Sequence, residues 1–178
     1  FPVAAVVGKW KLVGMNAALT VKGQCVSTDY RYKRWYNKMN DYFDGWAFYK
    51  YWEVEEYSHG SVLPLIRKPE MYYMAAECLL ETGNAADRIK AIEYLNTVRD
   101  NRGIAKLGND MTAGTVQDEI TKEYQREFIG EGQLFYYYKR LGFEKIPYST
   151  KPGSDAVYVV PLPSGDVGLG GMEDYKKK

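Results

Sequence analysis

The chain has 178 residues, of which 46% are hydrophobic and 26% charged, a composition typical of a folded globular protein with a core. Its formal net charge is +1, so no large field favours binding to nucleic acid or to an acidic membrane surface. Aromatic residues make up 15%, including 17 tyrosines. A core of this size cannot bury so many phenol groups with bonded hydroxyls, so we expect several at a surface, where Tyr and Trp are enriched in binding sites.

The sequence contains no complete targeting segment. No run approaches the ~18 consecutive apolar residues of a membrane span. Residues 1–8 lack an initiator Met and the features of an intact signal peptide, which favours a fragment of a longer protein whose signal lies upstream. The two cysteines do not fix the redox compartment. We expect Cys78 in a helix core, and a Cys25–Cys78 disulfide is the less favoured alternative.

Residues 1–66 are predicted to form an irregular, aromatic-rich segment. A short strand is expected between Val3 and Val13, where glycines interrupt it. From Tyr30 to Tyr57 the aromatic positions follow neither the period of a strand nor that of a helix, which indicates loops and short strands.

Residues 67–142 are predicted to be helical. A first helix, from Glu70 to Thr82, ends at Gly83-Asn84, and a second covers about 86–101. The apolar stripe of the first helix is expected to consist of Met71, Met74, Ala75, Cys78 and Leu79. Together the two helices form an αα-hairpin, the unit of TPR-like solenoids, and a single hairpin needs neighbours to bury its faces.

A third helix is predicted from near Thr115, with a capping pattern over Thr115–Asp118, to Gly142. Gly130 and Gly132 each weaken it by about 1 kcal/mol relative to Ala, so close packing or a local break is expected there. The last segment, 143–178, is predicted to hold a loop, a short β-branched strand over 156–160 and a glycine-rich tail.

A series of short motifs runs through residues 29–166. In chain order they are Asp29-Tyr30-Arg31, Lys50-Tyr51, Pro64-Leu65-Ile66-Arg67, Glu70-Met71-Tyr72, Ala75-Ala76-Glu77, Leu95-Asn96-x-Val98-Arg99-x-x-Arg102-Gly103, Ile120-x-x-Glu123-x-x-x-Glu127-Phe128-x-x-Glu131-Gly132, Lys139-Arg140-Leu141-Gly142 and Val159-Val160-Pro161-Leu162-Pro163-x-x-Asp166. Their order resembles the SusD/RagB family. Tyr124 stands where the family has the second residue of a Glu-Arg pair, Asp166 replaces its usual Glu, and the Asn-Pro ending is absent.

The resemblance implies a mainly α fold of TPR-like helical hairpins with irregular loops and a few short strands, in one C-terminal SusD-like domain made of 1–66, 67–142 and 143–178. It implies a binding protein and no enzyme, without a cofactor, that captures oligosaccharides or peptides on the outer face of a Bacteroidota outer membrane. Its implied partner is a SusC-like TonB-dependent transporter, and its membrane attachment is an upstream lipid anchor that is not in this chain.

Candidate ligand-binding residues lie in the aromatic segment. They are Trp35, Tyr36, Trp46, Tyr49 and Trp52. Sugar rings present flat C–H faces that pack on indole and phenol rings, and interleaved Asn, Asp and Lys residues can bond the hydroxyls. The same aromatics would also serve in a loop-rich core or at an interface with a protein partner, which leaves a purely structural lid of the transporter as an alternative function.

Glu123, Glu127 and Glu131 share one helix face, because they repeat every four residues. As an acid–base pair they would make the protein a glycan hydrolase, but such pairs normally converge from separate elements. The favoured interpretation is salt bridging to cations on neighbouring helices, with Arg99, Arg102, Arg126 and Arg140 as candidates.

Other catalytic and metal motifs are weak. His59 is the only histidine and is expected in a solvated loop, so neither a catalytic triad nor a metal site is predicted. The glycines at 168–171 lack the context of a phosphate loop, and Glu53, Glu55 and Glu56 lack that of a calcium loop.

Overall fold

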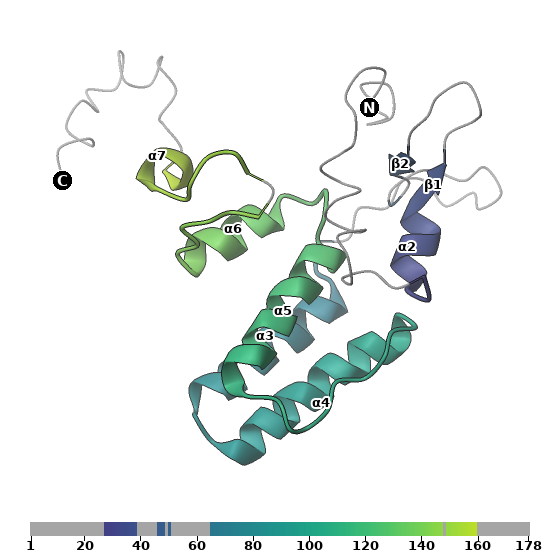
Figure 1. Ribbon diagram of the computed structural model, residues 1–178, viewed down its shortest axis with the longest axis vertical. Coiled ribbons are helices and arrows are strands. Elements are labelled where there is room, and N and C mark those ends of the chain that lie inside the picture. Colours follow the sequence, from purple (N-terminus) through teal and green to yellow (C-terminus); the bar gives the residue numbers. More distant parts are fainter. Residues whose placement is uncertain (1–26, 39–45, 49, 51–64, 148, 160–178) are drawn as a thin grey trace, which may run out of the picture. The chain divides into compact units, whose positions relative to one another are not determined.

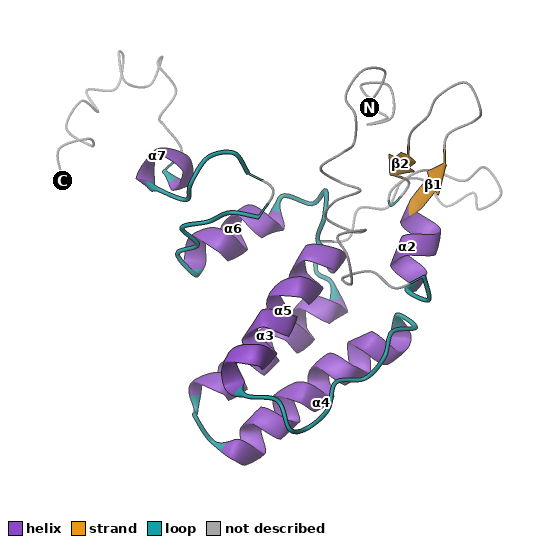
Figure 2. Ribbon diagram, in the orientation of Figure 1, coloured by secondary structure: helices purple, strands orange, loops and turns teal. Residues whose placement is uncertain are grey.

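The computed structural model describes residues 27–38, 46–48, 50, 65–147 and 149–159. The chain divides into two compact units, unit 1 (Phe1–Glu131) and unit 2 (Gly132–Lys178). Unit 1 contains α2 (Tyr30–Trp35), β1 (Tyr36–Lys38), β2 (Trp46–Phe48), α3 (Lys68–Glu81), α4 (Ala85–Asn101) and α5 (Ala113–Glu127). Unit 2 contains α6 (Gln133–Arg140) and α7 (Asp155–Tyr158). The described residues are mainly helical (Figures 1 and 2), which confirms the predicted class at that level.

The two helices predicted after residue 67 are present as α3 and α4. Gly83, at φ 68°, follows the end of α3, which confirms a glycine stop there. Asn84 belongs to the next helix, because its side chain accepts a hydrogen bond from the Ala86 amide at 2.8 Å and so caps α4. Figure 1 shows α3, α4 and α5 packed side by side, and these three helices form the scaffold of unit 1.

The predicted core stripe of α3 is wrong. Tyr73 and Ala76 are fully buried, whereas Met71 and Met74 are 43% and 39% exposed and the Cys78 thiol is exposed. Apolar residues surround much of this helix, so their spacing alone does not choose between neighbouring stripes. Packing chooses the stripe with Tyr73, whose ring lies 5.3 Å from that of Tyr124 on α5, centroid to centroid.

The predicted third helix is divided in two. Helix α5 begins at Ala113, because Thr112 and not Thr115 provides the cap: the Thr112 hydroxyl accepts the Thr115 amide at 3.2 Å. The expected local break is confirmed, since α5 ends at Glu127 and both Gly130 (φ 78°) and Gly132 (φ 79°) take left-handed conformations before α6 begins.

In unit 2 the strand predicted over 156–160 is wrong, because α7 covers Asp155–Tyr158. The amides of Val157 and Tyr158 both donate to the Ser154 carbonyl at 2.8 Å. The Tyr158 hydroxyl donates to the Phe143 carbonyl at 2.7 Å, and its ring packs 5.9 Å from that of Phe135. These contacts outweigh the weak β preference of the valines.

The segment after residue 27 begins with helix α2, where loops and short strands were predicted. The Asp29 carboxylate accepts the Arg31 amide at 2.9 Å, which caps this helix. After α2, β1 and β2 pair antiparallel, with Tyr36 opposite Phe48 and Lys38 opposite Trp46. The strand predicted between Val3 and Val13 and the glycine-rich tail lie outside the described residues.

Candidate functional site

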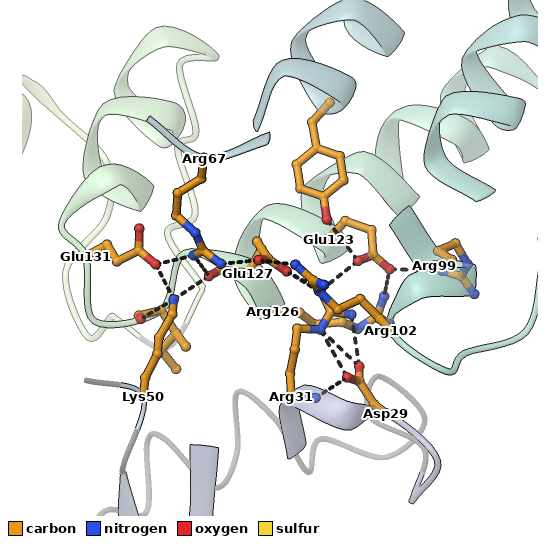
Figure 3. A network of polar contacts seen from close by, with 12 residues as sticks. Asp29, Arg31, Lys50, Arg67, Arg99, Arg102, Glu123, Arg126, Glu127 and Glu131 are labelled. Atoms are coloured by element: carbon orange, nitrogen blue, oxygen red, sulfur yellow. Dashed lines mark hydrogen bonds and ion pairs between the residues drawn. The ribbon is translucent and has the colours of Figure 1, made fainter. Parts of the chain in front are cut away.

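A network of buried ion pairs surrounds the C-terminal half of α5 (Figure 3). Glu123 and Glu127 on this helix, together with Asp29, are each 0% exposed. The cations that reach these carboxylates and the neighbouring Glu131 come from several elements: Arg31 on α2, Lys50, Arg67 before α3, Arg99 on α4, Arg102 after it and Arg126 on α5. We call this set the charged core.

Arg31 joins α2 to α5. Its guanidinium, 2% exposed, donates to the Asp29 carboxylate at 2.9 Å, to Glu123 at 2.9 Å and to Glu127 at 3.1 Å. Burial alone would lower the pKa of Arg31, but Glu123 and Asp29 raise it well above the ordinary value. The arginine is therefore permanently charged, and it fixes the position of α2 on the scaffold.

Glu123 connects four helices. Besides Arg31, its carboxylate accepts from Arg126 at 2.6 Å, from Arg99 at 3.1 Å and from the hydroxyl of Tyr73 at 3.3 Å. Burial alone would raise the pKa of Glu123, but Arg31, Arg126 and Arg99 hold it below the ordinary value. The side chain is thus an ionised, fully bonded anchor.

Glu127 is bonded in the same manner. Arg102 donates to it twice, at 2.9 and 3.1 Å, and Arg67 donates a further bond. Burial works to raise the pKa of Glu127, while the hydrogen bond from Arg102 and the charges of Arg31 and Arg67 lower it below the ordinary value. The fork of Arg102 ties the end of α4 to α5.

Lys50 and Arg67 cap the C-terminal end of α5. Arg67 donates to the Glu127 carbonyl at 2.9 Å, and Lys50 donates to the same carbonyl and lies 3.4 Å from that of Ile129. Both cations also pair with Glu131. Burial lowers the pKa of Lys50 to about 8, against the opposing effect of Glu131. Cations at these carbonyls complement the negative end of the helix dipole.

The geometry removes the basis for acid–base chemistry at these carboxylates. A general acid must hold a proton and reach its substrate, whereas Glu123 and Glu127 are buried, paired with arginines and held at lowered pKa. The predicted salt bridges are confirmed for Arg99, Arg102 and Arg126. The fourth candidate, Arg140 in unit 2, lies over the Tyr137 ring at 5.5 Å.

Sequence reasoning about these glutamates missed three of their partners, Arg31, Lys50 and Arg67. All three occur in the short motifs along the chain, but their spacing from α5 gives no local signal: Arg31 and Glu127 are 96 residues apart. The signal that could have found them is their place in the ordered motifs, which they share with the α5 glutamates.

Of the predicted ligand residues, Trp35 is the one whose side chain is described. It ends α2, is half-buried, and has the Lys50 ammonium 4.3 Å and the Arg67 guanidinium 6.0 Å from its ring centroid. Tyr36 begins β1 and Trp46 begins β2, so the strand pairing brings their backbones into one ribbon. Tyr49, Trp52, Cys25, His59, the acidic positions 53–56 and the glycines at 168–171 lie outside the described residues.

Neither a metal cluster nor a membrane-spanning helix is found in the part of the chain that the structure describes. No three His, Cys, Asp or Glu residues there are arranged to hold a metal ion. No helix there has the length and apolar character required to cross a bilayer.

The three glutamates of the α5 motif, Glu123, Glu127 and Glu131, are all committed to ion pairs with cations from other elements. Comparison with protein-family models gives a match to the SusD family over residues 9–168. The chain belongs to the SusD family, a family of nutrient-binding proteins associated with the outer membrane. No curated protein matches the chain, and no solved structure does.

Proposed function

We propose that this protein captures oligosaccharide or peptide nutrients at the extracellular face of the outer membrane and delivers them to a SusC-like TonB-dependent transporter. The observation that carries the proposal is the family match over residues 9–168. Capture rests on stacking and hydrogen bonds, and no bond of the ligand is made or broken. Attachment through a lipid anchor and an origin in Bacteroidota belong to the same proposal.

A division of labour within the chain supports this function. The charged core uses the residues of the family-like motifs, and its carboxylates are buried, so these residues hold the scaffold and do not face a ligand. In the scaffold, α3 and α4 form a hairpin that we propose to be a TPR-like unit. Ligand contact then falls to side chains outside the charged core, and we place the first candidates in the segment 1–66.

Within that segment we propose Trp35, Tyr36, Trp46, Tyr49 and Trp52 as ligand residues. Trp35 has a second role, because the cations that close α5 lie against its ring. Its replacement therefore disturbs both the scaffold and the ligand. Trp46 and Trp52 are therefore tested beside Trp35 as separate tryptophans of the proposed ligand cluster.

The test is intrinsic tryptophan fluorescence of the protein, titrated with a panel of host and plant glycans and of short peptides. Trp46→Ala, Trp52→Ala and Trp35→Phe are compared with the parent protein, and Trp10→Ala serves as the control outside the proposed cluster. Circular dichroism verifies each fold. A saturable change that survives in Trp10→Ala but is lost in a folded cluster variant identifies both the ligand class and a contact residue.

Two other outcomes would redirect the assignment. If no glycan and no peptide changes the fluorescence, and an outer-membrane barrel copurifies with the protein, the protein would instead be a purely structural lid of the transporter. Turnover of a glycan that disappears in a folded Glu127→Gln variant would establish a hydrolase, although burial and ion pairing of Glu127 predict no turnover at all.

A further inference from the structure

Helix α2 has one face in the charged core and another in solvent. Arg31 points into the core, while Tyr30, Lys33 and Arg34 are exposed. Residues three and four apart are neighbours on a helix surface, so the two cations lie one turn along from the phenol ring. We call these three side chains the α2 outer face. An exposed aromatic ring beside two cations is a combination that can bind both the flat face and the charge of one ligand.

The tyrosine of this face is held in a fixed position. Its amide donates to the Arg102 carbonyl at 2.9 Å. Its ring lies against the backbone of Gly103, where an added Cβ would come within 2.9 Å of two ring atoms. Even so, Tyr30 remains 54% exposed. The ring is therefore presented outward from a rigid support, which lowers the entropy lost when a ligand stacks on it.

The cations of this face are available for a ligand. The carboxylates nearest to α2 in the charged core are taken: Asp29 is paired with Arg31, and Glu127 with Arg31 and other arginines. Among the residues that the structure describes, no ion pair joins Lys33 or Arg34 to an acidic side chain. Positive charge thus accumulates at this end of α2.

A similar residue pattern occurs a second time, in unit 2, where the Arg140 guanidinium also lies 5.5 Å from the Tyr137 ring centroid. Residues 30–34 and 136–140 share the pattern Tyr-x-Tyr-Lys-Arg, and both stretches are helical. On α6, Tyr136 is 71% exposed, and Lys139 and Arg140 are exposed one turn along. We call these three the α6 outer face. The second position of each stretch is buried, Arg31 in one and Tyr137 in the other, so both helices present the same three residue types outward.

We propose that the α2 and α6 outer faces are two subsites for acidic oligosaccharides, each stacking one sugar ring on its tyrosine and binding the carboxylate or sulfate of that sugar with its Lys and Arg. The inference rests on the proposed function and specifies its ligand class. An arginine guanidinium can donate two parallel hydrogen bonds to a carboxylate or sulfate, and a lysine adds a compact positive charge. A flat sugar face over the ring places its acidic substituent beside these cations.

The experiment uses calorimetric titration of the full chain with oligogalacturonides and with their methyl esters, which keep the sugar but remove its charge. Glutamate oligomers serve as an acidic ligand without a sugar ring. The variants are Lys33→Gln with Arg34→Gln, Lys139→Gln alone, and the two tyrosine substitutions Tyr30→Ser and Tyr136→Ser. Lys145→Gln with Lys151→Gln is the control, because it removes two exposed positive charges that belong to neither outer face.

We expect the parent protein to bind the acid form more tightly than the ester. The Lys33/Arg34 variant should weaken binding of the acid about fivefold to tenfold and leave the ester unchanged, since each exposed ion pair contributes a factor of a few. Lys139→Gln should produce a smaller loss of the same kind. Each tyrosine variant should weaken acid and ester alike. The control should change neither.

Equal affinity for acid and ester would overturn the inference while leaving the proposed function intact. An unchanged affinity in the variants of one face would remove that face as a subsite. Another outcome is that glutamate oligomers bind as tightly as the oligogalacturonides and lose affinity in the same variants. That result would overturn the inference, because the faces would then bind acidic groups without contacting a sugar ring. Failure of every glycan and peptide to bind would instead overturn the proposed function itself.

Discussion

The two units are stabilised by different interactions. Unit 1 is organised around charges: the carboxylates of Glu123 and Glu127 are fully buried and bonded to arginines from separate elements. In unit 2 the described side-chain packing is aromatic, with ring centroids 5.1 Å apart for Tyr138 and Phe143. The contact between two aromatic rings does not depend on a partner charge, whereas a buried carboxylate that loses its cation is strongly destabilising. Unit 1 should therefore be the unit that responds to pH and to single charge substitutions.

The sharpest test of this contrast is Arg31→Met. The substitution leaves Asp29, Glu123 and Glu127 buried with fewer partners, and we expect unit 1 to lose about 3–5 kcal/mol of unfolding free energy. Hydrogen exchange measured by mass spectrometry reports α5 and α6 separately. Protection should fall in α5 and persist in α6.

Arg34→Met is the matched control for this substitution, because it replaces the same residue type at an exposed position of the same helix. It should change the free energy by less than about 0.5 kcal/mol. Equal losses in the two variants would contradict the central role of the charged core.

A second test concerns how α2 is seated on the scaffold. Gly103 (φ +70°) lies against Thr28 and the Tyr30 ring, while Gly83 (φ +68°) has nothing within 4 Å of an added Cβ. Gly83→Ala should cost only the left-handed conformation, about 1–2 kcal/mol. Gly103→Ala adds steric overlap, for about 1–3 kcal/mol more. Chemical denaturation of both variants isolates that difference, and identical midpoints would mean that α2 does not pack against Gly103.

Acid should act on unit 1 before unit 2. The folded pKa values of Glu123 and Glu127 lie below the ordinary value, which for an unfolded chain is about 4.3. Between those values the unfolded chain binds more protons, so this stabilisation is complete above about pH 5 and is lost as the pH falls through the folded pKa values. Hydrogen exchange at stepped pH should show α5 losing protection first. Parallel loss in α6 would contradict the contrast between the units.

The last test lies on the alkaline side, at Lys50. Its folded pKa is about 8, below the unfolded value of about 10.4. Between these values the unfolded chain holds the proton that the folded chain has released, so this titration makes unit 1 more stable as the pH rises from 8 to 10. The melting temperature of Lys50→Met relative to that of the parent protein should therefore decrease over this range.

Lys68→Met serves as the control for the alkaline measurement, since Lys68 is exposed at the start of α3. The difference between this variant and the parent protein should not depend on pH. A flat difference for Lys50→Met as well would show that the Lys50 ammonium is not buried against α5.

Several features of the fold were available from local patterns. The sequence predicted α3 and α4 to within a few residues, because helical periodicity and end signals such as Gly83 act over one or two turns. It also predicted the break at Gly130 and Gly132, and the pairing of the α5 glutamates with arginines from neighbouring elements. The order of the motifs indicated the SusD family, which the family match confirms.

Other features depended on contacts between distant residues. Only the packing of α3 on α5 decided that Tyr73, and not Met71 or Met74, faces the core. The helix α7 replaced a predicted strand because Tyr158 bonds the Phe143 carbonyl. Likewise, α2 forms where its capping residue Asp29 is fixed by an arginine that also reaches α5.

The sequence by itself thus determined the helical class, the ends of α3 and α4, and the kind of partner that the buried glutamates need. Tertiary structure alone decided which stripe is buried, where Arg31 and Lys50 are placed, and which face of α2 is exposed to solvent. The physical reason is range. Capping and periodicity act within a few residues along the chain, whereas burial and ion pairing bring together groups such as Arg31 and Glu127, which are 96 residues apart.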